Sequence, residues 1–203
     1  MPGDRVTIAC VTEGHGEVKA LPKLLYRIAR DNAVGNLDVP EPFRSNRGRL
    51  VAPGGLEKAV QAMALRAWPV GGVLVLIDAD DDCPADLGPR LLGRARQARS
   101  DIPVSVVLAN REFEAWFLAA APSLAGHCGL EELAVPDDPE QVRGAKEWLS
   151  RRRTDGGRYS PTVDQAVLAS RFDMKLARAG SPSFDKFCRE VEMLLRVDRG
   201  EQA

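Results

Sequence analysis

The chain has 203 residues, of which 44% are hydrophobic, so it is long and apolar enough for one compact domain with a buried core. Its formal net charge of −1 provides no overall field that would attract nucleic acid or a membrane, and any nucleic-acid contact would need a local basic patch. No apolar run approaches the roughly 20 residues that span a bilayer. The first residues lack the pattern of a signal peptide, and we therefore expect a cytoplasmic protein without membrane contact.

The first part of the chain alternates between short apolar runs and amphipathic segments. The apolar, β-branched runs predict buried parallel strands at 5–12, 73–77 and 103–109. Segments with helical spacing of apolar residues predict helices at 16–31, 55–68, 84–99 and 110–121. The helix at 55–68 is expected to bury Leu65 and Trp68, and the Pro- and Gly-containing stretch 31–49 is expected to be a loop with a short edge strand near Phe43. This alternation predicts an α/β fold, with a mainly parallel sheet flanked by helices.

After Pro122 the strand signals stop. Helical spacing continues at 139–153, 162–179 and 183–196, with Ser183 as the expected N-cap of the last helix. We therefore predict two parts, an α/β core over 1–121 and a helical extension over 122–203 that packs on the core.

Two acidic clusters follow strands of the predicted sheet. The first runs from Glu13 to Glu17 with Gly14 and Gly16 as tight-turn residues, and the second is the acidic run 78–82. Carboxylates crowded at a strand end repel one another unless they are splayed apart or a divalent cation neutralises them. Because ligands bind at the carboxyl ends of strands in open α/β sheets, the two clusters predict one Mg²⁺ or Mn²⁺ site.

The expected metal ligands are Glu13, Glu17, Asp78 and Asp80. Asp78 and Asp80 would face opposite ways in an extended strand, so the strand must end at Asp78 for the turn to bring Asp80 back. A structural alternative stays open for Glu17, which could cap the helix that it begins, and for the acids at 81–82, which could be solvated.

This pair of motifs resembles the Toprim domain, which topoisomerases, bacterial primases and the overcoming-lysogenization-defect (OLD) nucleases share. The family pattern is a Glu after the first strand and an Asp-x-Asp after a later one, here Glu13 and Asp78-Ala79-Asp80. The spacing from Glu13 to Glu17 matches the Glu-Gly-x-x-Glu of the OLD-type branch. The stretches 73–84, 109–117 and 181–184 resemble a family of free-standing Toprim-like proteins of unknown function, often encoded beside an ATPase, and some ATPase-paired relatives are nuclease effectors of antiphage defence.

The resemblance implies a Mg²⁺-dependent nuclease that hydrolyses phosphodiester bonds of DNA or RNA, as an effector with an ATPase partner, in antiphage defence. Glu13 would be the general acid/base or a metal ligand, and Asp78 and Asp80 would hold the metal. Glu17 could bind a second ion.

Further candidates lie after the strand at 103–109. A helical start there would place Glu112 and Glu114 near the same sheet edge, although both could instead be acids of a solvated helix N-terminus. Arg111 lies at the strand end, where it could contact a phosphate. Toprim nucleases often use a basic residue late in the domain. In this chain the spacing of the motifs does not show which residue has that role. The candidates for that residue are Lys146, Arg153 and Arg158.

Other functions remain open. The chain could be a non-catalytic Toprim-like subunit that regulates or binds an ATPase. A strand that ends in Asp-x-Asp also occurs in haloacid-dehalogenase phosphatases and in nucleotide-sugar glycosyltransferases. However, Asp82 stands where the phosphatases usually have Thr or Val, and neither class explains Glu13 and Glu17.

Overall fold

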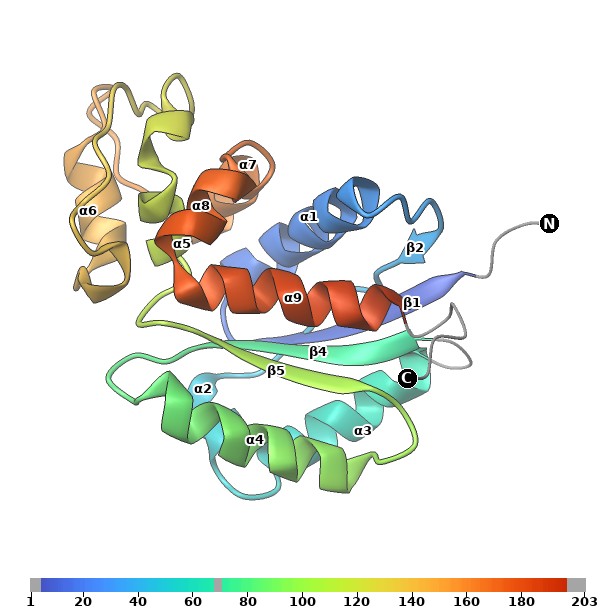
Figure 1. The fold of residues 1–203 in the computed structure, drawn as a ribbon. Coiled ribbons are helices and arrows are strands. Elements are labelled where there is room, and N and C mark those ends of the chain that lie inside the picture. Colours follow the sequence, from blue (N-terminus) through green and yellow to red (C-terminus); the bar gives the residue numbers. More distant parts are fainter. Residues whose placement is uncertain (1–4, 68–70, 197–203) are drawn as a thin grey trace.

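The structure is a computed structural model, and it describes residues 5–67 and 71–196 (Figure 1). Within these residues, five parallel strands form one sheet in the order β2-β1-β4-β5, with β3 also pairing with β1. The strands are β1 (Val6–Thr12), β2 (Leu37–Asp38), β3 (Phe43–Arg44), β4 (Gly71–Asp78) and β5 (Val104–Ala109). The predicted α/β class with a mainly parallel sheet is therefore confirmed, including the edge strand at Phe43.

Helices cover both faces of the sheet (Figure 1). On one face lie α1 (His15–Asp31) and α9 (Pro182–Arg196), and on the other lie α3 (Gly55–Ala67) and α4 (Pro84–Ala98), with the short α2 (Arg47–Val51) before α3. Side chains of β1 alternate between the two layers, so that Ile8 packs with α1 and α9 whereas Ala9 packs with α3 and α4. The last helix of the sequence thus covers the sheet directly, next to the first.

The helix α3 differs in one detail from its prediction. Leu65 is 75% exposed, because Ala64 and Met63 occupy the buried face and the next residue is turned about 100° away from Ala64. Trp68 lies outside the described residues.

The predicted helix at 110–121 begins late. Residues 110–114 form a turn in which Arg111 has a φ of +59°, and α5 extends only over Ala115–Ala119, followed by the 3₁₀ helix η1 (Ala121–Leu124). The side chain of Asp78 accepts a hydrogen bond from the Phe113 N–H, 2.8 Å away, which holds this turn against the end of β4. A tertiary contact therefore replaces the first helical turn.

The helices predicted after Pro122 are shorter than expected. The segment 139–153 contains the 3₁₀ helix η2 (Pro139–Gln141) and α6 (Ala145–Arg151), separated by Gly144 in the left-handed region, with a φ of +70°. The segment 162–179 is divided into the π-helical turn η3 (Pro161–Gln165), α7 (Ala166–Ala169) and α8 (Met174–Gly180).

The N-cap of α9 is Ser181 rather than the predicted Ser183. The helix begins at Pro182, which is favoured at a first helical position, and the Ser181 Oγ accepts the Phe184 N–H at 3.1 Å. Ser183 instead lies inside the first turn, where its Oγ accepts a hydrogen bond from Trp116 Nε1 at 2.8 Å.

Aromatic side chains join α5 to α9. The ring of Trp116 lies 5.1 Å from that of Phe184 and 5.0 Å from that of Phe187, measured between ring centroids. Trp116 and Phe117 are fully buried, as expected for core residues. This cluster fixes the turn before α5 and with it the carboxylates at 112 and 114. In the described part of the chain, no helix has both the length and the apolar character that crossing a membrane requires.

Candidate active site at the carboxyl ends of the strands

Glu13 and Asp78 meet at one edge of the sheet. Glu13 follows β1 directly, and Asp78 is the last residue of the neighbouring strand β4. The Glu13 Oε2 accepts a hydrogen bond from the backbone N–H of Asp78 at 3.3 Å. The structure therefore brings together the first residues of the two acidic clusters, and the strand does end at Asp78 as the prediction requires.

Asp78 is buried among other acids. Its Oδ1 accepts the Phe113 N–H, and its side chain has little contact with solvent. Burial raises the pKa of Asp78 well above its usual value, and the negative charges of Glu114, Glu13 and Glu17 raise it further. A proton or a bound cation would relieve this repulsion.

Glu13 is half-buried, and its pKa is raised to about 7. Burial is the largest cause and the charge of Glu17 the next, while the hydrogen bond from the Asp78 N–H opposes both. A carboxyl group with a pKa near 7 can both accept and donate a proton at neutral pH, as a general acid/base must.

Two further carboxylates share one amide side chain. The Nε2 of Gln165 donates to Glu17 Oε1 at 3.3 Å and to Glu114 Oε1 at 3.2 Å, and the hydroxyl of Tyr159 also donates to Glu114, at 2.8 Å. Glu17 in addition accepts the N–H of Gly14 and so caps α1, the structural role left open by the sequence. Tyr159 and Gln165 carried no signal in the sequence, because they approach the site only through the fold of the C-terminal segment.

Lys146 is the basic residue beside these acids. Its Nζ lies 3.1 Å from Glu112 Oε2 and 3.4 Å from Glu114 Oε2. Burial acts to lower the pKa of Lys146, but the charges of Glu114, Asp78 and Glu112 outweigh it and raise the pKa above its usual value. Lys146 thus stays positively charged and offsets part of the negative charge of the cluster.

The other two basic candidates lie elsewhere. Arg153 is ion-paired with Asp155 at 2.6 Å and with Asp164 at 3.0 Å, and Arg158 is exposed on the following loop. Of the three residues named from the sequence, the structure places only Lys146 against the acidic cluster.

Asp80 lies at the rim of the site in the left-handed conformation, with a φ of +53°. Its carboxylate is ion-paired with the Nε of Arg47 at 3.3 Å. Arg47, from α2, also donates to the carbonyl oxygens of Asp78 at 2.9 Å and Ala79 at 3.0 Å, and so fixes the turn after β4. Nothing in the sequence singled out Arg47, because it lies in a stretch that was predicted to be a loop and is far in sequence from the motif that it contacts.

Arg111 and Glu112 connect the end of β5 to neighbouring segments. The guanidinium of Arg111 lies 3.2 Å from Asp81 and donates to Gln141 at 3.0 Å, and Glu112 accepts the N–H of Gly144 at 3.1 Å. Glu112 thereby binds the start of α6 and positions Lys146. A phosphate contact by Arg111 stays a prediction.

The chain bends between β1 and α1 at Gly14, as expected, and Gly16 has a further role in packing. Neither Gly14 nor Gly16 has a positive φ. At Gly16, an added Cβ would overlap the side-chain oxygen of Gln165 and lie 2.8 Å from the carbonyl oxygen of Pro161. Gly16 therefore allows α1 to approach η3 closely, which brings Gln165 to Glu17.

The fit of a divalent cation depends on how many ligands the protein must supply. Across residues 5–67 and 71–196, no three His, Cys, Asp or Glu side chains converge closely enough to hold a metal ion by themselves. Mg²⁺, however, usually takes one or two carboxylates together with water and substrate phosphates. The oxygens of Glu13 and Asp78, which repel each other at the sheet edge, are a donor set that fits this mode of binding.

Comparisons with known proteins give one family. Neither the curated proteins nor the solved structures include a match to this chain. Residues 12–192, which contain every strand end and carboxylate described above, match the model of a domain of unknown function (DUF4276), and the chain belongs to that family.

Proposed function

We propose that this chain is a metal-dependent nuclease that hydrolyses phosphodiester bonds of DNA or RNA. The observation that carries the proposal is the meeting of Glu13 and Asp78, where a carboxyl group with a pKa of about 7 contacts the last residue of the adjacent strand. The carboxyl ends of strands are the usual ligand site of open α/β sheets.

Glu13 and Asp78 would hold a Mg²⁺ or Mn²⁺ ion, with Asp80 and Glu17 as the further ligands expected from the sequence. When bound, the ion would act as a Lewis acid on the phosphate and lower the pKa of a coordinated water. Glu13 and Asp78 would lose their protons on binding it, because the charge of the ion would offset the burial and the repulsion that raise their pKa values.

The chain's own residues would position and move protons. Where Asp78 and Asp80 hold the ion and Glu13 does not, Glu13 would keep its raised pKa and accept the proton of the attacking water near neutral pH. The Phe113 N–H holds Asp78 in a fixed orientation, and Lys146 keeps its charge beside Glu114. The positive charge of Lys146 would make the site less repulsive to an approaching phosphate.

The resemblance to Toprim-like proteins extends the proposal to an effector that acts with an ATPase partner in antiphage defence. Co-expression with an ATPase encoded beside the gene, followed by co-purification and plaque counts, tests this part. Unchanged plaque counts and no co-purification would limit the proposal to the hydrolase alone.

The hydrolase is tested by calorimetric titration of Mn²⁺ and Mg²⁺ beside nuclease assays on single- and double-stranded DNA and RNA. We expect Glu13→Gln and Asp78→Asn each to lose metal binding and hydrolysis. Glu132→Gln is the matched control, because Glu132 is exposed and its side chain has no partner in the described part of the chain. Hydrolysis at the wild-type rate by Glu13→Gln would contradict the proposal.

One observation favours the second candidate, a non-catalytic Toprim-like subunit of an ATPase complex. Glu17 and Glu114 already have protein donors, and no set of three acids among the described residues forms a ready metal site. In that case Glu13→Gln and Asp78→Asn would leave ATPase binding and biological activity unchanged.

A further inference from the structure

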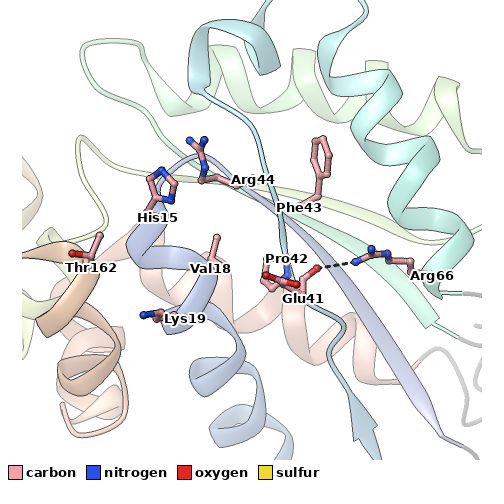
Figure 2. A pocket seen from close by; sticks show the side chains of 9 residues that line it. All are labelled: His15, Val18, Lys19, Glu41, Pro42, Phe43, Arg44, Arg66 and Thr162. Atoms are coloured by element: carbon pink, nitrogen blue, oxygen red, sulfur yellow. Dashed lines mark hydrogen bonds between the residues drawn. The ribbon is translucent and has the colours of Figure 1, made fainter.

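A basic pocket lies beside the acidic cluster, between α1 and β3 (Figure 2). It has a volume of about 500 Å³. Residues from several parts of the chain line it: His15 and Lys19 from the first turns of α1, Phe43 and Arg44 from β3, and Arg66 from the end of α3. These five residues are all exposed, so the pocket is open to solvent.

The pocket carries positive charge that the protein does not neutralise. Lys19, Arg44 and Arg66 outnumber its one acid, Glu41, although the whole chain has a net charge of −1. Arg66 donates to the backbone oxygen of Glu41 at 3.1 Å (dashed in Figure 2), but none of the three cations is ion-paired with a carboxylate of the described residues. By contrast, Arg47 at the neighbouring rim is paired with Asp80. Free cations in a concave site attract phosphates.

Phe43 supplies an exposed aromatic ring on the same pocket. It is 41% exposed, whereas the other five phenylalanines of the chain are fully buried. The ring is held on a strand, because Phe43 pairs with Val11 of β1 in the parallel register. An exposed ring beside cations is the combination by which proteins bind single-stranded nucleic acid, with bases stacked on the ring and phosphates on the cations.

The pocket borders the segment that carries Glu13. Arg44 pairs with Thr12 in the sheet, and its guanidinium lies 3.5 Å from the carbonyl oxygen of Glu13. His15 comes two residues after Glu13 at the start of α1. A chain of nucleotides bound in the pocket would therefore lie next to the segment between β1 and α1 that carries Glu13.

We infer that this pocket binds single-stranded nucleic acid, with phosphates at Lys19, Arg44 and Arg66 and a base on Phe43, and presents the adjoining phosphodiester to Glu13 and Asp78. The inference rests on the proposed hydrolase and names its substrate class. A duplex does not fit this mode of binding, because its bases are already stacked and paired and cannot lie on Phe43.

The test is fluorescence anisotropy with the full chain and a labelled oligonucleotide, in EDTA so that no hydrolysis occurs. Single-stranded DNA, single-stranded RNA and duplex DNA of one sequence are titrated at several salt concentrations. The variants are Lys19→Gln/Arg44→Gln and Phe43→Ala. The matched control is Lys58→Gln/Arg90→Gln, whose cations are exposed, lie on α3 and α4, and line no part of the pocket.

We expect a single strand to bind more tightly than the duplex. Lys19→Gln/Arg44→Gln should weaken binding about tenfold and reduce the slope of log K against log salt by about 1.4, the value for two lost phosphate contacts on a single strand. Phe43→Ala should weaken binding about tenfold without changing the salt slope, since stacking releases no counterions. The DNA and RNA arms show which sugar the pocket prefers.

Several results would overturn the inference. One is that the wild type binds no single strand, or binds the duplex as tightly as the single strand. Another is that the control variant loses as much binding affinity as the pocket variants. A third is that AMP at an equal phosphate concentration displaces the strand. Failure of the proposed hydrolase would be distinguishable from failure of this inference. Binding of the single strand in EDTA without hydrolysis in Mn²⁺ would support the binding pocket and reject the nuclease. Hydrolysis in Mn²⁺ without binding in EDTA would support the nuclease and reject the binding pocket.

Discussion

The acidic cluster and the basic pocket lie on either side of the end of β1, yet they handle charge in opposite ways. The acids at 13, 17, 78 and 114 are wholly or partly buried, repel one another and are held by donors from distant segments. The cations of the pocket are exposed and have no carboxylate partner in the part of the chain that the structure describes.

The difference indicates that the acidic cluster carries out the reaction and the basic pocket binds the substrate. Burial shifts pKa values and fixes geometry, which chemistry needs, whereas exposed and unpaired cations remain available to a polyanion. If so, substitutions in the cluster should change reaction and folding, and substitutions in the pocket should change binding alone.

The largest expected effect is on the reaction. Glu13→Gln keeps the size of the side chain but removes its proton-accepting group, and should lower the rate of metal-dependent hydrolysis by about 10²- to 10⁴-fold. Binding of a single strand in EDTA should not weaken. The measurements are the single-turnover cleavage rate and the fluorescence anisotropy of strand binding. An equal loss of cleavage rate and of binding affinity would show that the cluster and the pocket do not have separate functions.

The next effect tests the contact between α1 and η3 that completes the cluster. Gly16→Ala should reduce the free energy of unfolding by about 1–3 kcal/mol, because the new methyl group meets the backbone of Pro161 and displaces Gln165. Gly93→Ala is the control, since no atom lies within 4 Å of the added Cβ and alanine favours the middle of α4. Urea unfolding should show Gly93→Ala stabilised by up to about 1 kcal/mol. A Gly16→Ala protein as stable as wild type would reject the close approach.

A third prediction compares one cation from each region. Lys146→Met should destabilise the protein by about 1–2 kcal/mol, because Glu114 is fully buried and loses the ion pair that offsets its charge. Arg66→Met should change stability by less than about 0.5 kcal/mol, because Arg66 is exposed and has no carboxylate partner among the described residues. Thermal unfolding of the two variants measures the difference, and equal losses would mean that the pocket is structural.

The contrast also explains what the sequence could predict. The end of a strand can be predicted from a short stretch of sequence. Two apolar runs, and the parallel sheet that they imply, were therefore enough to predict that Glu13 and Asp78 lie close together. The sheet and the helices on its faces followed from periodicity in the same way. The predicted burial of Leu65 was wrong, because the buried face of α3 includes the preceding residue, Ala64, instead.

The remainder of the site depends on contacts between residues distant in sequence. Lys146, Tyr159 and Gln165 come from a segment whose helices are short and interrupted, where apolar spacing predicted two continuous helices instead. The turn at 110–114 was missed because a side chain of another strand, Asp78, replaces its helical hydrogen bond. The pocket was missed because its cations belong to three elements that are separate in the sequence and meet only in the fold.

The smallest predicted effect is a pH dependence of stability. The pKa of Glu13 rises from its ordinary 4.5 to about 7 on folding, and those of Asp78 and Glu114 also rise, so the folded protein binds protons more tightly than the unfolded chain. In EDTA, the free energy of unfolding should therefore fall as pH increases from 4.5 to 7. Glu13 is partly solvated, which screens its interactions and limits its share to about 1 kcal/mol. Urea unfolding at several pH values should show a shallower decline for Glu13→Gln and an unchanged decline for Glu132→Gln. A decline as steep in Glu13→Gln as in the wild type would mean that the pKa of Glu13 is not raised in solution, and the role of Glu13 as an acid/base near neutral pH would be rejected.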